Sequence, residues 1–168
     1  MDECAFHTRP HLVKAWQRRG CPLKAPMGGD QRQSVFGALD YGSGKVTWRM
    51  HPTKSGDAFA AFLEQVTQTW PTEQLVLVMD NASYHRAPVV KAWWAAQDRR
   101  ITPFWLPVYS PHLNLIERVW RFLKQKLACH RFWADIDGLT AAVTILLDHI
   151  EAHFHSDDRP AIKLGQHL

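Results

Sequence analysis

The stretch LVLVMDNASYH, residues 75–85, is the strongest indication of the fold in this sequence. Five apolar residues followed by an acid are typical of a short parallel strand that is buried on both faces. Asp80 ends the run, and Asn81, Ser83 and His85 bring further polar groups to the same end of the strand. In open α/β sheets, active groups gather beyond the carboxyl ends of the parallel strands. Asp80 is therefore a candidate catalytic residue, although an Asp at this position often only caps the following turn.

The segments around this strand predict a mixed α/β domain. Two β-rich runs flank the turn-forming stretch YGSG and predict a hairpin. Ser55 is placed to cap a helix whose apolar side chains recur at helical spacing. Residues 1–33, which contain several Pro and Gly, are expected to be loop with at most short structure. The expected order is a hairpin at 35–50, a helix at 56–69, a strand at 75–80, a helix at 87–98, a strand at 101–107, a helix after the loop that begins at 106, and a helix at 136–153. Alternation of strands and helices after the hairpin indicates a sheet covered by helices.

Length and composition indicate one soluble globular domain. The chain has 168 residues, of which 46% are hydrophobic and 21% are charged. No apolar run reaches the ~20 residues that a membrane span needs, and the N-terminus lacks a signal-peptide pattern. Three widely spaced cysteines, Cys4, Cys21 and Cys129, fit a reducing compartment better than a disulfide framework. We therefore expect a cytoplasmic protein.

Positive charge is concentrated in the middle of the chain. Residues 86–131 contain nine Lys and Arg against two acids, whereas residues 132–168 contain two against six. The net charges are therefore +7 (9 − 2) and −4 (2 − 6). A central basic block predicts a surface that binds a polyanion, although a solvated basic face is an equally simple interpretation.

Glu117 is one of the two acids in this basic block and lies near the start of the predicted helix after residue 106. One interpretation is structural: Asn114 followed three residues later by Glu117 resembles a capping box. The other is functional, since Asp2, Asp80 and Glu117 lie at the ends of different elements. Carboxylates placed in this way can hold a pair of Mg²⁺ ions, which suits phosphoryl transfer on a substrate with a phosphodiester backbone.

The segments VLVMDNASYHRAPVV and WLPVYSPHLNLIERVWRFLK closely resemble the DDE transposase domain of the IS630 group of insertion sequences, within the Tc1/mariner superfamily. Between Asp80 and Glu117 lie 36 residues (117 − 80 − 1), close to the usual interval of this family. DECAFHTRPHLVKAWQRRG resembles the first block of the family, and FGALDYGSG fits its hairpin. The resemblance runs from residue 2 to about residue 145.

This resemblance implies an RNase H-like mixed sheet flanked by helices and a metal-binding triad of Asp2, Asp80 and Glu117. It also implies two Mg²⁺ or Mn²⁺ ions and a DNA substrate, namely the terminal inverted repeats of a transposon and its target DNA. The implied reaction is hydrolysis at the transposon ends, followed by attack of the freed 3′-hydroxyl on target DNA. Further residues implied to orient the site or contact DNA are Asn81, His85, Asn114, Arg118, Arg121 and Lys124.

Two departures from the family pattern bear on activity. Leu115 stands where the family has Pro, which is favoured in the first turn of a helix, and its loss should cost little if the cap holds. Only Met1 precedes Asp2, so we expect the first, central strand to be missing. Residues 1–168 are then a single, N-terminally truncated DDE catalytic domain without the helix-turn-helix DNA-binding region. Such a fragment would be a second reading frame, a decayed copy or a gene start placed too late. We expect weak or no independent transposition. The expected protein partners are a second copy of the chain (a homodimer) or an upstream-frame product, with no membrane association.

Three alternatives remain open from the sequence. One is a remnant that binds DNA or a partner without catalysis, and another is a different RNase H-like DNA endonuclease. A third is a zinc site formed by His149, His153 and His155, whose spacing is compatible with metal ligation.

Overall fold

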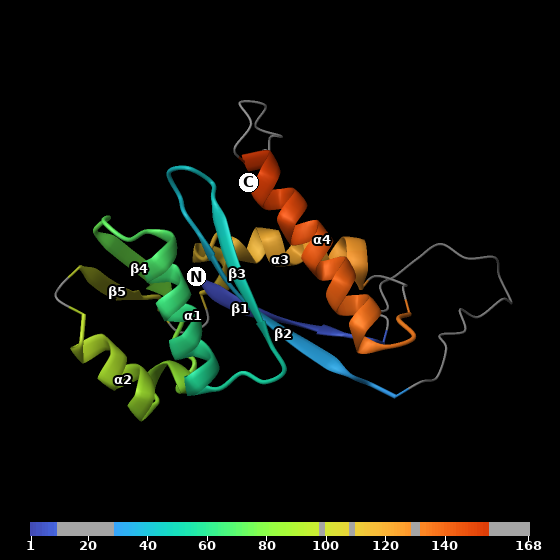
Figure 1. The fold of residues 1–168 in the computed structure, drawn as a ribbon, viewed down its shortest axis with the longest axis horizontal. Coiled ribbons are helices and arrows are strands. Elements are labelled where there is room, and N and C mark those ends of the chain that lie inside the picture. Colours follow the sequence, from blue (N-terminus) through green and yellow to red (C-terminus); the bar gives the residue numbers. More distant parts are fainter. Residues whose placement is uncertain (10–28, 98–99, 108–109, 129–131, 155–168) are drawn as a thin grey trace, which may run out of the picture.

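The computed structural model describes residues 1–9, 29–97, 100–107, 110–128 and 132–154, and Figure 1 shows how the elements are arranged. A three-stranded antiparallel sheet has the order β1-β2-β3, and a two-stranded parallel sheet consists of β4 and β5. The elements are β1 (Asp2–His7), β2 (Arg32–Leu39), β3 (Val46–His51), α1 (Gly56–Thr69), β4 (Leu75–Met79), η1 (Ser83–Arg86), α2 (Pro88–Ala95), β5 (Ile101–Trp105), η2 (Pro111–Leu113), α3 (Ile116–Leu127) and α4 (Ile136–Phe154). The predicted mixed α/β class is confirmed, and the predicted element order is confirmed from the hairpin of β2 and β3 onward.

A strand begins at Asp2, so the expectation that the first strand is missing is wrong. β1 pairs antiparallel with β2, with Asp2 opposite Gly37 and His7 opposite Arg32. Cys4 and Phe6 alternate with more exposed residues and are buried, which is the pattern of a strand with one face in the core. The prediction failed because it placed the strand before Asp2, whereas the strand begins at Asp2 and runs to His7, within a segment that its Pro and Gly content had marked as loop.

The three-stranded sheet is covered by helices on both faces. Phe36 of β2 packs with α1 in one apolar cluster, whereas its neighbour Val35 packs with α3 and α4 in another. Successive residues of a strand point to opposite faces, so the two clusters lie on opposite sides of β2. Helices α1 and α2 share the first cluster with apolar residues of β4 and β5, whereas α3 and α4 share the second, so α1 and α4 lie on opposite faces of this sheet (Figure 1).

Gly37 allows α3 to approach β2 closely. A Cβ atom at residue 37 would lie 2.6 Å from the Trp120 ring and 2.8 Å from the Ile116 side chain. Both neighbours are buried residues of α3. Because interiors are close-packed, only a residue without a side chain fits between this helix and the strand.

The two-stranded sheet is buried on one face only. Leu77 and Met79 of β4 pack in the cluster with α1, whereas Val76 is 65% exposed and Phe104 of β5 is 56% exposed. The expectation that this strand is buried on both faces is therefore wrong for the part of the chain that the structure describes. The amine of Met1 donates a hydrogen bond of 2.6 Å to the Val78 carbonyl and links β4 to the start of β1.

Other local predictions hold. Ser55 caps α1, because its side chain accepts a hydrogen bond from the Ala58 amide at 3.2 Å. Cys4 is a free, buried cysteine, and burial raises the pKa of its thiol to about 11, so this thiol is unreactive at neutral pH. Cys21 and Cys129 lie outside the described residues. Across the ranges described, no helix combines the length and the apolar character that crossing a bilayer requires.

Candidate metal centre

The three predicted metal-binding acids come from three different elements. Asp2 is the first residue of β1, Asp80 directly follows β4, and Glu117 is the second residue of α3. Residues that lie opposite each other in a ladder point to the same face, so Asp2 shares the face of Gly37, on which α3 packs. The start of α3 thus brings Glu117 to the side of β1 on which Asp2 lies.

The charges of Glu117 and Asp80 act on Asp2, but in the described residues the ligand atoms of Asp2, Asp80 and Glu117 do not form a group within 4.8 Å of one another. The pKa of Asp2 is raised to about 7, chiefly by burial, and then by the negative charges of Glu3, Glu117 and Asp80. A carboxyl group in such a place repels the other carboxylates whenever it ionises. A divalent cation would offset this repulsion, and carboxylate oxygens are the ligands that Mg²⁺ and Mn²⁺ prefer. The donor set therefore fits a hard divalent cation.

Asp80 both caps a turn and remains open to solvent. Its Oδ1 accepts a hydrogen bond of 3.0 Å from the Ala82 amide, while half of its side chain is exposed. The two interpretations of this acid are compatible, because a carboxylate can accept several hydrogen bonds and still offer an oxygen to a cation.

Asn114 does not form the capping box that the sequence suggests. The cap position of α3 is Leu115, and no side chain caps the helix. The buried Asn114 amide instead donates a hydrogen bond of 2.9 Å to the Met1 carbonyl, 113 residues away in the chain. Asn114 therefore ties the segment before Glu117 to the segment before Asp2.

Asn81 and His85 are also held by internal contacts. The Asn81 amide donates to the Leu106 carbonyl at 2.7 Å, and its oxygen accepts from Arg86 at 2.9 Å. His85 Nδ1 lies 3.1 Å from the Asp80 carbonyl oxygen and 3.3 Å from Asp80 Oδ1. These two side chains brace the loop that carries Asp80.

The predicted basic residues Arg118, Arg121 and Lys124 are exposed along α3. On a helix, residues three or four apart lie on one face, so Glu117, Arg121 and Lys124 are aligned. The arrangement places positive charge beside one of the three acids.

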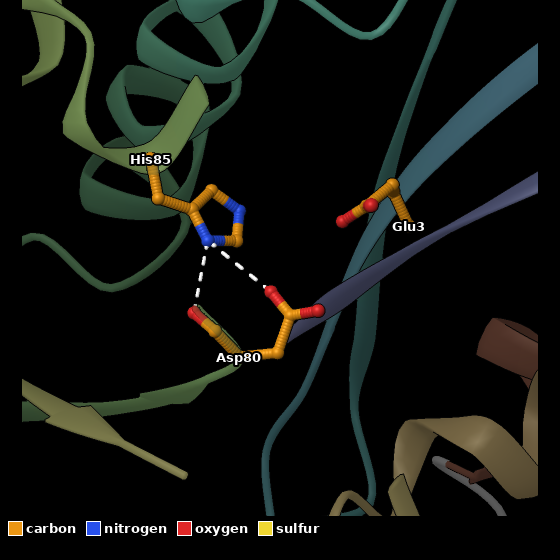
Figure 2. Close-up of side chains that lie close together, drawn as sticks. All are labelled: Glu3, Asp80 and His85. Carbon is orange, nitrogen blue, oxygen red and sulfur yellow. Dashed lines mark hydrogen bonds and ion pairs between the residues drawn. The ribbon is translucent and has the colours of Figure 1, made fainter. Parts of the chain in front are cut away.

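Glu3 joins the site without having been predicted. Glu3, Asp80 and His85 each offer a ligand atom, and these atoms lie within 4.8 Å of one another (Figure 2). Because Glu3 follows Asp2 in a strand, its side chain lies on the opposite face of β1. Recognising the alternation around Cys4 and Phe6 would have assigned the two acids to different faces.

Apolar and aromatic groups surround this second group of ligand atoms. The rings of Phe59 and Tyr84 lie 4.2 Å and 4.6 Å from the His85 ring, measured between centroids. Burial lowers the pKa of His85, and burial together with the charge of Glu3 raises the pKa of the Tyr84 hydroxyl above its usual range. Both side chains are therefore neutral at neutral pH.

The predicted zinc site is not tested by the described residues. His149 lies on α4, which ends at Phe154. The side chain of His153 and the whole of His155 lie outside the described residues. The zinc site on this helix therefore stays a prediction.

Comparisons with known proteins bear on the family and the fold of this chain. A family model described as DDE superfamily endonuclease matches residues 1–140. The "Insertion element IS630 uncharacterized 39 kDa protein" of Shigella sonnei is 28% identical over 138 residues, which are 79% of this chain and 40% of that protein. "Uncharacterized protein y4pE/y4sA" of Sinorhizobium fredii (strain NBRC 101917 / NGR234) is 28% identical over 106 residues, which are 62% of this chain and 75% of that protein. The chain thus spans about 40% of the length of the IS630 relative.

Solved structures share the fold. The "Mos1 transposase paired-end complex with left transposon end" matches 92% of this chain and 50% of that chain, with a TM-score of 0.64 and 13% identity. The "Mos1 Strand Transfer Complex" matches 92% of this chain and 53% of that chain, with a TM-score of 0.61 and 12% identity. At this identity the similarity concerns the fold alone, and it confirms the predicted RNase H-like class. The family model covers most of the chain, and the predicted resemblance to IS630-group and Tc1/mariner transposases is confirmed: the chain belongs to the DDE superfamily endonucleases.

Proposed function

We propose that this chain is the catalytic domain of an insertion-sequence transposase that cleaves DNA at transposon ends and joins it to target DNA. The observation that supports the proposal is that Asp2, Asp80 and Glu117 stand at the ends of three elements and that the charges of Asp80 and Glu117 act on Asp2, in a chain of the DDE family. DNA is the proposed partner, in the form of the terminal inverted repeats and the target.

The three acids would hold two Mg²⁺ or Mn²⁺ ions. When bound, such a pair stabilises the attacking and the leaving oxygen of an in-line displacement at phosphorus. The chain's own contribution is to fix the carboxylates in space. β1 orients Asp2, the loop after β4 orients Asp80, and the first turn of α3 orients Glu117.

Three of the predicted residues would hold the acids in position without being ligands of this centre. Asn114 links the segment before Glu117 to Met1, and Asn81 links the loop of Asp80 to the end of β5 through the Leu106 carbonyl. His85 contacts the main chain and the side chain of Asp80. Because such partners orient metal ligands, we assign Asn81, His85 and Asn114 a positioning role.

The exposed cations of α3 would hold the DNA backbone. Arg118, Arg121 and Lys124 are exposed and follow Glu117 along the helix. Arginine and lysine bind phosphate oxygens and release counterions from DNA, so their contribution depends on salt. This arrangement would bring a phosphodiester close to the acids.

The test is cleavage of labelled transposon ends in Mg²⁺, by this chain and by a version extended upstream. Asp80→Asn and Glu117→Gln should each reduce the rate by more than about 100-fold, since loss of outer partners alone costs 10–100-fold. Asp57→Asn, which changes an exposed acid in the first turn of α1, is the matched control and should cleave like the parent.

Two outcomes would contradict the proposal. Cleavage that persists in Asp80→Asn would show that the acids are not the metal ligands. DNA binding that depends on salt but is never followed by cleavage, and that Asp80→Asn leaves unchanged, would instead identify a DNA-binding remnant without catalysis.

A further inference from the structure

A second group of possible metal ligands adjoins the three acids. It includes Glu3, whose side chain lies on the opposite face of β1 from Asp2. Glu3 comes from β1, Asp80 from the end of β4 and His85 from η1, and one ligand atom of each lies within 4.8 Å of the others (Figure 2). Asp80 belongs to both groups, whereas Glu3 and His85 belong only to this one.

The hydrogen bonding of His85 assigns its protons. Its Nδ1 lies 3.1 Å from the carbonyl oxygen of Asp80, and a carbonyl oxygen can only accept a hydrogen bond. Nδ1 therefore carries the proton, and Nε2 of the neutral ring carries a lone pair. Nε2 is buried and has no hydrogen-bond partner, and the side chain is only 1% exposed.

The carboxylate of Glu3 is in a similar situation. Its Oε1 lies 3.3 Å from the ammonium of Lys54, whereas Oε2 is buried and meets no hydrogen-bond criterion; the nearby Tyr84 hydroxyl, also buried, interacts with this carboxylate. The Glu3 side chain is 9% exposed. Figure 2 shows the ring nitrogen of His85 that does not contact Asp80 on the side of the ring that faces the Glu3 carboxylate.

Two buried acceptor atoms in one group are costly unless donors or a cation satisfy both of them. The Tyr84 hydroxyl has a single proton and can satisfy only one of the two. Lys54 neutralises one of the two carboxylates, so the group of Glu3, Asp80 and Lys54 has a net charge of −1 (1 − 2). A divalent cation satisfies both free atoms and is attracted by this charge.

The donor set distinguishes this site from the three acids. One imidazole nitrogen with two carboxylates suits Zn²⁺, Co²⁺ or Mn²⁺, whereas carboxylates alone suit Mg²⁺. A histidine that binds a metal through one ring nitrogen usually donates the other N–H to a carbonyl or a carboxylate, as His85 does to Asp80. The half-exposed Asp80 side chain offers a path from solvent.

We propose that Glu3, Asp80 and His85 form a separate binding site for a divalent transition-metal ion of the Zn²⁺ type, through Glu3 Oε2, His85 Nε2 and the Asp80 carboxylate. The site adjoins the three-acid centre and shares only Asp80 with it. A cation bound at this site would hold the Asp80 carboxylate on the side away from Asp2 and Glu117.

The experiment measures Zn²⁺ binding to the whole chain by calorimetry without Mg²⁺, together with the visible absorption of bound Co²⁺. Glu3→Gln and His85→Gln should each weaken Zn²⁺ at this site by at least 10-fold and remove the Co²⁺ band of a nitrogen-containing site. Asp2→Asn and Glu117→Gln, which remove acids of the neighbouring centre alone, should leave this binding step in place.

Circular dichroism and thermal unfolding of each variant separate lost binding from lost folding. Zn²⁺ affinity that is unchanged in folded Glu3→Gln and His85→Gln would overturn the proposal, and so would loss of the Co²⁺ band in Asp2→Asn or Glu117→Gln. Because the readout is metal binding without DNA, its failure leaves the cleavage test of the three acids untouched, and a failed cleavage test leaves this result standing.

Discussion

Asp2 lies directly opposite Gly37 in the ladder between β1 and β2, and the Trp120 ring of α3 lies over that glycine. The acid on the strand and the helix that carries Glu117 therefore meet at one point of the sheet. The distance between Asp2 and Glu117 depends on how closely α3 approaches β2. A glycine of the scaffold thus controls the geometry of the proposed metal centre.

Gly37→Ala should destabilise the fold and disturb the centre. Its Cβ would lie 2.6 Å from the ring of Trp120, a fully buried side chain, so α3 must move outward. Overpacking of this kind lowers the free energy of unfolding by about 1–3 kcal/mol. Urea unfolding measures the loss, and Gly29→Ala, with no neighbouring atom within 4 Å of its Cβ, is the matched control. Equal midpoints for the two variants would contradict the proposed packing.

Asp2→Asn should stabilise the metal-free protein at alkaline pH. The folded-state pKa of Asp2 is about 7, against an ordinary value of 3.8, so the folded state binds this proton more tightly than the unfolded state does. Stability therefore falls as the pH rises from about 4 to about 7 and stays low above that range. In EDTA, the variant should melt above the parent at pH 8 and close to it near pH 4. A lower melting temperature for the variant at pH 8 would show that ionised Asp2 is stabilising.

Asn114→Ala should cost stability and metal affinity together. The substitution removes the donor to the Met1 carbonyl and leaves a buried polar group without its partner. Such a loss costs about 1–3 kcal/mol. Urea unfolding and Mn²⁺ titration measure the two effects, and Gln125→Ala on the exposed face of α3 is the control. If Mn²⁺ binds unchanged while stability falls, Asn114 supports the fold without positioning the acids.

Arg121→Ala should weaken DNA binding without changing the rate of cleavage at saturating DNA. Loss of one phosphate contact should reduce the slope of log affinity against log salt by about one. Fluorescence anisotropy at several salt concentrations measures this slope. Lys91→Ala, which removes an exposed cation of α2, should keep the slope of the parent. Similar slopes for both variants would remove Arg121 from the proposed DNA surface.

Local patterns predicted most of the fold, and contacts between distant segments account for what was missed. The hairpin and the Ser55 cap depend on residues close together in the chain, and both are confirmed. The predicted capping box paired Asn114 with its near neighbour Glu117. The Asn114 amide instead donates its hydrogen bond to the carbonyl of Met1, 113 positions away. Glu3 escaped notice because its place depends on the pairing of β1 with β2 and on the approach of β4. The spacing of residues along the chain does not predict such contacts between distant segments.

The hydrogen bond between Met1 and Val78 spans 77 positions of the chain, and it joins the two sheets that carry Asp2 and Asp80. Contacts of such long range are entropically expensive to close and slow the folding of the proteins that depend on them. The packing of α3 and α4 on β1 and β2 also joins segments far apart in the chain, so the acids meet only after these distant contacts form. Formation of a cation site would therefore be among the last events of folding, and its appearance in time would report that the chain has reached its native topology.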